Sequence, residues 1–127
     1  MTENAIATLI VDAAYKIHTT LGPGLLESVY QVTLNYELKK RGLSVHQQVG
    51  LPVYYEELRL GIGYRVDLIV GDKVIIEIKS IEALAPIHKR QLLTYLRLAN
   101  LRLGLLINFN VERIRDGIQR VVNGLGC

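Results

Sequence analysis

The chain has 127 residues, of which 50% are hydrophobic and 21% are charged, and its formal net charge is +3. This length and composition predict a single soluble domain over residues 1–127, and the weak positive charge permits a polyanionic partner without requiring one. No apolar run approaches the roughly 18 residues that cross a bilayer, and no signal peptide opens the chain, so we expect no membrane partner and a cytoplasmic location. The single cysteine, Cys127, excludes an internal disulfide and argues against a zinc site.

The N-terminal part is predicted to form two helices. Apolar residues at helical spacing indicate an amphipathic helix over residues 3–20, and residues 21–24, with two glycines around a proline, must end it. A second helix is predicted over residues 26–41, with Gly42 as its stop. Glu27 lies in its first turn, where the helix dipole favours a negative charge. In a second interpretation, Glu27 points across the fold toward the acidic residues of the strands described next.

Three strands are predicted to follow. The first covers residues 45–55, with Pro52 near an edge or a bulge. The second covers residues 58–70 and is bent at its glycines, and the third covers residues 73–80. The second and third strands carry runs of β-branched residues on either side of Gly71-Asp72, which is typical of a β-hairpin.

The C-terminal part alternates between helix and strand. A helix is predicted over residues 87–100, a short buried strand over residues 103–109, and a final amphipathic helix over residues 111–122. The order ααβββαβα predicts an α/β (α+β) fold in which helices flank both faces of a mixed central sheet.

Charged residues interrupt the two apolar strands of the hairpin. Asp67 lies within one run, and Glu77 and Lys79 lie two apart in the other, so the strand period places that acid and that base on one face. Two carboxylates about 4 Å apart repel by roughly 4 kcal/mol at an effective dielectric constant of about 20, which a divalent cation offsets better than one lysine. Three interpretations stay open: a metal site, a buried Asp/Glu–Lys pair and a solvated edge strand.

The length of the hairpin loop decides whether the two acids meet. A two-residue turn at Gly71-Asp72 would pair Asp67 with Ile76 and leave it on the wrong face for Glu77. A three-residue loop that includes Lys73, or one β-bulge, would pair Asp67 with Glu77 instead. The metal-site hypothesis requires the second arrangement.

Three motifs in the chain resemble those of a known superfamily. Asp67 followed by Glu77-Ile78-Lys79, in a βββαβ context, resembles the PD-(D/E)XK nuclease superfamily, although a valine stands in place of the proline of that name. Residues 91–95, QLLTY, resemble the QxxxY motif of its RecB-like branch. Residues 24–30, GLLESVY, match the signature of the GxxExxY proteins, and the likeness runs from about residue 10 to residue 123.

The resemblance implies a restriction-endonuclease-like fold and a metal-dependent nuclease. The implied ligands of Mg²⁺ or Mn²⁺, direct or through water, are Glu27, Asp67, Glu77 and the backbone carbonyl of Ile78. Lys79 is implied to position the attacking water, and we favour an electrostatic role for it over that of a base. Gln91 and Tyr95 are implied to orient Lys79 or the scissile phosphate, although a polar helix face explains them as well.

Nucleic-acid contacts are expected from four further side chains. Tyr30 shares a helix face with Glu27 at i+3, and His88 shares a face with Gln91. Arg65 and Lys89 could meet backbone phosphates, although a solvated surface charge also explains each of them. No basic stripe or exposed aromatic series supports reading of the base sequence.

Two functions of different classes are compatible with these residues. The first is a metal-dependent nuclease that acts on DNA or, less favoured, on RNA. The second is a non-catalytic module that uses the same fold to bind nucleic acid or protein. Because the domain is compact, we expect a homodimer or an accessory protein to supply what a minimal nuclease core lacks.

Overall fold

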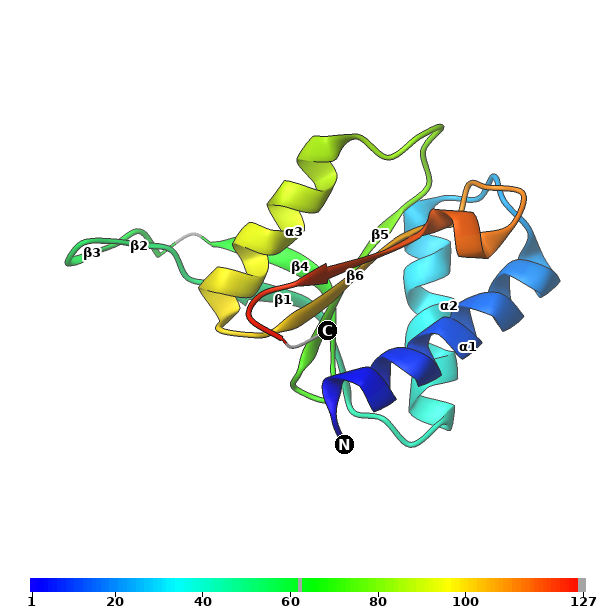
Figure 1. Ribbon diagram of the computed structural model, residues 1–127, viewed down its shortest axis with the longest axis horizontal. Helices are drawn as coiled ribbons and strands as arrows, with labels where there is room; N and C mark the ends of the chain where they lie inside the picture. Colours follow the sequence, from blue (N-terminus) through cyan, green and yellow to red (C-terminus); the bar gives the residue numbers. More distant parts are fainter. Residues whose placement is uncertain (62, 126–127) are drawn as a thin grey trace.

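The computed structural model of the protein describes residues 1–61 and 63–125. Its centre is a five-stranded sheet (Figure 1). The strand order is β1 (Val45–Leu51), β4 (Tyr64–Val70), β5 (Val74–Lys79), β6 (Leu103–Asn108) and β7 (Ile118–Val122). β5 and β6 run parallel and the other neighbours run antiparallel, so the sheet is mixed, as the sequence predicted.

Helices cover both faces of this sheet. α1 (Glu3–Leu21) and α2 (Glu27–Lys40) pack on one face and α3 (Pro86–Ala99) on the other (Figure 1). β5 is buried on both faces, because Ile76 joins the cluster of α1 and α2 while Ile75 joins that of α3. Such double burial explains why the strand reads as an almost continuous apolar run. No helix within the described residues has the length and apolar character needed to cross a bilayer.

The end of the chain differs from the prediction. The expected helix over residues 111–122 is wrong, and the structure has a 3-10 turn, η1 (Ile114–Gly117), followed by β7. Ile114, Ile118 and Val121 repeat at helical spacing, but the β-branched run of β7 pairs antiparallel with β6. Cys127, on which the expectation about disulfides rested, lies outside the described residues.

The two long strands predicted before the hairpin are also corrected. Each divides in two, giving β2 (Tyr54–Tyr55) and β3 (Leu58–Arg59) in addition to β1 and β4. The division begins at Pro52, which has no N–H to give to a sheet. β2 and β3 pair only with each other, as a hairpin that stands out from the body of the protein (Figure 1). We call residues 53–60 the arm. A hydrogen bond from Leu60 N–H to the Val53 carbonyl, at 3.0 Å, closes it.

A glycine in β6 sets the distance between α3 and the sheet. A Cβ atom at Gly104 would lie 2.9 Å from both Cγ and Cδ1 of Leu92, whose side chain is fully buried. The helix rests directly on the strand backbone at this point. The missing side chain therefore fixes the height of α3, which carries Gln91 and Tyr95.

We predict that Gly104→Ala destabilises the protein by about 1–3 kcal/mol, because the added methyl overpacks a closed contact. Gly50→Ala is the matched control, since this glycine also lies in a strand and a Cβ there would meet no atom within 4 Å. Chemical denaturation of both variants measures the difference. Equal unfolding free energies for the two variants would contradict the prediction.

Candidate active site

The hairpin of β4 and β5 has the register that the metal-site hypothesis requires. Leu68 pairs with Ile76 and Val70 with Val74, and residues 71–73 form the loop. Continued by one residue, this register places Asp67 opposite Glu77. Of the two loop lengths that the sequence left open, the structure therefore has the three-residue loop.

The regular backbone hydrogen bonds between β4 and β5 end where the two acids face each other. Hydrogen bonds to the two acidic side chains replace them. Asp67 Oδ2 accepts a hydrogen bond from Ile78 N–H at 2.7 Å, and Glu77 Oε1 accepts one from Asp67 N–H at 3.0 Å. Buried N–H groups need such partners, and the carboxylates supply them where the strands separate. Both acids are held at the carboxyl end of β5, with Glu77 only 8% exposed.

A break in the alternation of β4 turns Asp67 toward this site. Val66 packs with the α3 cluster, whereas Leu68 packs with the cluster of α1 and α2. On the neighbouring strand, Gln48 adopts the left-handed conformation, with φ 50°, and donates through Nε2 to Asp67 Oδ1 at 3.3 Å. Gln48 was missed by sequence reasoning, because nothing in the local pattern marks a glutamine that takes this conformation.

Glu27, the first residue of α2, reaches the same end of β5. Ser80 N–H donates to Glu27 Oε2 at 3.1 Å, and the Ser80 hydroxyl donates to the Leu25 carbonyl at 2.6 Å. A hollow of about 390 Å³ opens here, lined by Leu25, Leu26, Glu27, Ser28 and Ser80. The second interpretation of Glu27, in which it faces the hairpin acids, fits this position. Ser80 had no signal in the sequence.

Tyr30 holds the loop that delivers Glu27. Its side chain is fully buried. Its hydroxyl donates a hydrogen bond to the Gly22 carbonyl at 2.6 Å and accepts one from Leu25 N–H at 3.2 Å. Its ring stacks on Phe109, with centroids 4.3 Å apart and planes 5° apart. The expectation that Tyr30 contacts nucleic acid is corrected, because a buried ring with both hydroxyl roles taken is a structural residue.

Burial and mutual repulsion dominate the electrostatics of the two acids. Burial and, next, the charge of Asp67 raise the pKa of Glu77 to about 8. Burial also raises the pKa of Asp67, and the nearby Glu27 adds to this, while the Ile78 N–H, Gln48 and Lys79 oppose it. The site therefore concentrates negative charge that its own residues only partly balance, which is the situation a cation relieves.

Lys79 and Tyr95 lie beside these acids. Lys79 is half-buried, follows Glu77 on the same face of β5, and its charge favours the ionised form of both acids. Tyr95 is 6% exposed, and burial and the charge of Glu77 raise the pKa of its hydroxyl. Gln91, one turn earlier on α3, is exposed, so its contact with Lys79 or a phosphate stays a prediction.

The remaining predicted residues are exposed or half-buried. His88 Nδ1 accepts a hydrogen bond from Ala85 N–H at 2.9 Å, which caps the start of α3. This capping bond gives His88 a structural task and leaves its contact with a phosphate a prediction. Arg65 in β4 and Lys89 in α3 are exposed, and their phosphate contacts likewise stay predictions.

The donor set suits a hard divalent cation, although the side chains are not closed around one point. Across residues 1–61 and 63–125, no three His, Cys, Asp or Glu side chains are arranged as a metal site. Carboxylate oxygens are nevertheless the donors that Mg²⁺ and Mn²⁺ take, and Asp67, Glu77 and Glu27 bring three carboxylates to one end of β5. These acids therefore fit a divalent cation by their charge and by the type of their donor atoms.

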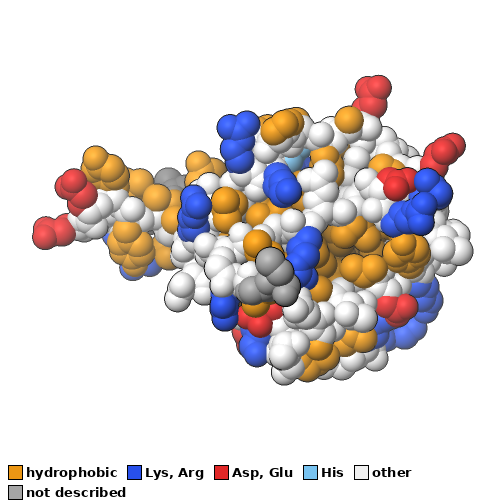
Figure 2. Space-filling view, in the orientation of Figure 1, with side chains coloured by type: hydrophobic (Ala, Val, Ile, Leu, Met, Phe, Trp, Pro, Cys, Tyr) orange, Lys and Arg blue, Asp and Glu red, His pale blue; other side chains and the backbone are white. Residues whose placement is uncertain are grey.

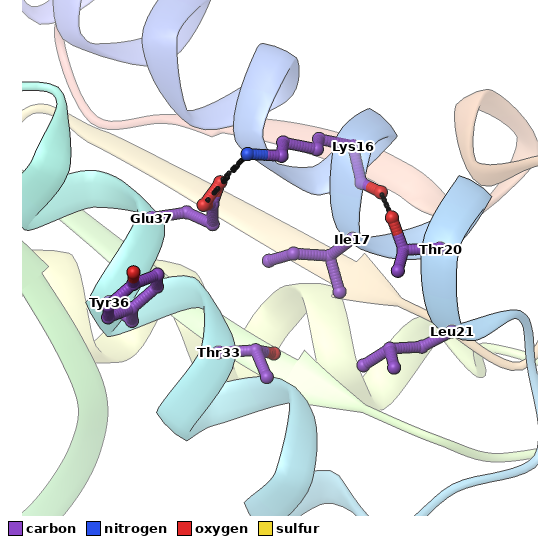
Figure 3. Close-up of a pocket in the computed structure, with 7 residues that line it drawn as sticks. All are labelled: Lys16, Ile17, Thr20, Leu21, Thr33, Tyr36 and Glu37. Atoms are coloured by element: carbon purple, nitrogen blue, oxygen red, sulfur yellow. Dashed lines mark hydrogen bonds and ion pairs between the residues drawn. The ribbon is translucent and has the colours of Figure 1, made fainter.

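A separate cavity between α1 and α2 lacks these features (Figure 3). It has a volume of about 180 Å³, and its charged residues are engaged with each other, since Lys16 Nζ lies 2.8 Å from Glu37 Oε1. Arg41 also pairs with this buried acid, at 3.3 Å, and Lys40 at 3.6 Å. The hydrogen bond from Lys16 holds the pKa of Glu37 below its ordinary value. The cavity is thus a seam between two helices that are tied by ion pairs.

The two buried glutamates are predicted to affect stability with opposite dependence on pH. Folding raises the pKa of Glu77 from about 4.5 to about 8. In EDTA, where no metal is bound, the free energy of unfolding should therefore fall as the pH rises from about 4.5 to about 8. Folding lowers the pKa of Glu37, so its ion pairs stabilise the fold above its ordinary pKa and are lost as the pH falls.

Relative to the parent protein, Glu77→Gln should therefore gain stability as the pH rises, and Glu37→Gln should lose it. Denaturant unfolding between about pH 4.5 and about pH 8 measures the first difference, and unfolding below about pH 4.5 measures the second. Parallel curves for the parent protein and Glu77→Gln would contradict the first expectation.

Comparisons with family models and with solved structures find proteins that are similar to this chain. The family model of the PD-(D/E)XK nuclease superfamily matches residues 4–121. Among solved structures, SSO0001 has a TM-score of 0.56 and 24% identity over 98% of this chain and 60% of that chain. The present chain thus spans less than two thirds of that protein. An alkaline exonuclease from Laribacter hongkongensis has a TM-score of 0.49 and 18% identity over 97% of this chain and 72% of that chain.

A comparison with curated protein sequences finds no match. The likeness to SSO0001 shows the fold alone. The match of the family model covers nearly the whole chain and includes both elements that carry Asp67 and Glu77. The chain belongs to the PD-(D/E)XK nuclease superfamily.

Proposed function

We propose that this protein hydrolyses phosphodiester bonds of nucleic acid, DNA in preference to RNA, with the help of Mg²⁺ or Mn²⁺. The observation that carries the proposal is the pair of hydrogen bonds that fixes Asp67 and Glu77 face to face at the end of β5. A fold gains no stability from two adjacent buried acids, because the raised pKa of Glu77 is a cost that a bound cation removes.

Each residue of the site has a task in this proposal. Asp67, Glu77 and Glu27, with the carbonyl of Ile78, would hold the cation. When bound, the cation supplies a water of lowered pKa and offsets charge on the phosphoryl oxygens. Lys79 orients that water and the phosphate by its charge and position.

The helix α3 contributes Tyr95 and Gln91. Tyr95 lies close enough to Glu77 for that charge to shift the pKa of its hydroxyl, so it is placed to orient Lys79 or the scissile phosphate. Gln91 lies one turn earlier on α3, is exposed, and is proposed to share this task.

This arrangement favours the finer assignments to the RecB-like branch and to the GxxExxY proteins. Gly24, Glu27 and Tyr30 each have a physical task in the structure, since Gly24 takes a φ of 94° and Tyr30 anchors the loop that presents Glu27. A cytoplasmic location, and a homodimer or an accessory protein as partner, belong to the same proposal.

The alternative is a non-catalytic binding module, in which the two hydrogen bonds that Asp67 and Glu77 accept would serve only to complete the sheet. Binding of DNA or RNA without cleavage in Mg²⁺ or Mn²⁺ would favour that alternative.

We predict that Lys79→Ala lowers the rate of DNA cleavage by about 100-fold or more, because one preorganised electrostatic contact to the reacting group is lost. Lys39→Ala removes an exposed lysine on α2 and serves as the control. Cleavage of linear, circular and single-stranded DNA, and of RNA, is measured in Mg²⁺ and in Mn²⁺. Equal rates in Lys79→Ala and Lys39→Ala would mean that the activity belongs to another site or to a contaminant.

We also predict that Mg²⁺ stabilises the parent protein near pH 8 and has little effect on Glu77→Gln. A ligand at about 100 times its Kd adds roughly 2.7 kcal/mol to the free energy of unfolding, and the variant lacks one charged donor. Thermal melting with Mg²⁺ and with EDTA gives the shift without any need for activity. Glu37→Gln should keep the full shift, and an equal shift in Glu77→Gln would argue against metal binding at this site.

A further inference from the structure

The arm exposes apolar side chains on both of its faces. Tyr54 pairs with Arg59 and Tyr55 with Leu58, and residues paired across two antiparallel strands share a face. Tyr54 is 59% exposed, Tyr55 67% and Leu58 59%, so neither face is covered. Figure 2 shows hydrophobic side chains along the arm, with acidic side chains at its tip. An isolated two-stranded ribbon is marginally stable, and exposed rings of this kind mark a binding surface.

The root of the arm is joined to the active site. β4 begins at Tyr64, only three residues before Asp67, which is about 10 Å along a strand. The ring of Tyr64 lies 5.4 Å from that of Tyr95, a residue of the proposed site. At Gly63 the backbone passes so close to the Leu51 carbonyl that a Cβ atom would clash with it. β4 therefore leads from the end of the arm to Asp67.

The types of side chain on the arm fit nucleobases. Aromatic rings stack on any base, and the guanidinium of Arg59 lies over the ring of Tyr54 at 5.9 Å, where it can stack on a base or meet a phosphate. Glu56 and Glu57 form the turn at the tip and repel phosphates. Tyr55 and Leu58 directly flank this turn, and Tyr54 and Arg59 form the next pair away from it. A nucleic-acid strand would thus stack on the rings with its phosphates on the side of Arg59 and away from the two glutamates.

We propose that the arm stacks unpaired bases of the nucleic acid whose backbone enters the active site, so that the substrate is a single strand or carries an unpaired end. This inference rests on the proposed function, which it deepens. A duplex keeps its bases stacked on each other, so its rings are not available to Tyr54 and Tyr55. Stacking on the arm therefore favours unpaired over paired substrates.

The test is binding in EDTA, where the proposed metal-dependent cleavage cannot occur. Fluorescence anisotropy measures the affinity for labelled oligothymidylate as a single strand and for the same strand paired with oligoadenylate. Tyr54→Ala and Tyr55→Ala should each weaken binding of the single strand by about 5-fold or more, with a smaller effect on the duplex. Tyr54→Phe keeps the ring and should bind like the parent protein.

Tyr36→Ala is the matched control. Tyr36 is 62% exposed and has Lys40 Nζ 5.2 Å from its ring centroid, so it resembles Tyr54 in exposure and in its cation, but it lies on α2 at the seam with α1. Its replacement should leave binding unchanged. No residue of β2 or β3 is buried, so the arm variants should keep the melting temperature of the parent protein. Unchanged melting temperatures would show that only the surface of the arm differs.

Three binding results would overturn the inference. They are parent-like binding by Tyr54→Ala and Tyr55→Ala, an equal loss for single strand and duplex, and no binding of the single strand by the parent protein. A change of mass on size-exclusion chromatography in place of a change in binding would assign the arm to a second copy of the chain, and would also overturn it. Tyrosine-dependent binding in a protein that never cleaves would refute the proposed nuclease activity and leave the arm as a base-binding site.

Discussion

The site depends on an exchange of hydrogen bonds at the point where β4 and β5 separate. A buried N–H group needs an acceptor, and here the acceptors are carboxylates in place of backbone carbonyls. Ile78 N–H is satisfied by Asp67, and Asp67 N–H by Glu77. The same bonds that complete the sheet therefore hold two acids together, and burial and, next, the charge of Asp67 raise the pKa of Glu77.

The third acid reaches this point through a different kind of constraint. Glu27 begins α2, and the loop before it is tied by the hydroxyl of Tyr30 to the Gly22 carbonyl and Leu25 N–H. The ring of Tyr30 is in turn fixed by its stack on Phe109, directly after β6. A chain of packing and hydrogen bonds thus connects the core of the protein to an exposed carboxylate at its surface.

The two buried glutamates show how one residue type serves opposite purposes. Glu37 is surrounded by Lys16, Lys40 and Arg41, so its charge is balanced and its pKa is lowered. Glu77 faces another acid, and its pKa is raised. The balanced glutamate explains how α1 and α2 stay together, whereas the unbalanced one identifies where a cation would be stabilised.

The sequence by itself determined α1, α2, α3 and the hairpin of β4 and β5, because periodicity and turn residues are local properties of the chain. It also marked Asp67, Glu77 and Lys79, since charges stand out within apolar strands. Only the tertiary structure decided that residues 118–122 form a strand, because the open edge of β6 overrides their helical spacing. It also decided that Tyr30 is buried and that Gln48 meets Asp67, because both contacts join segments that are distant in sequence.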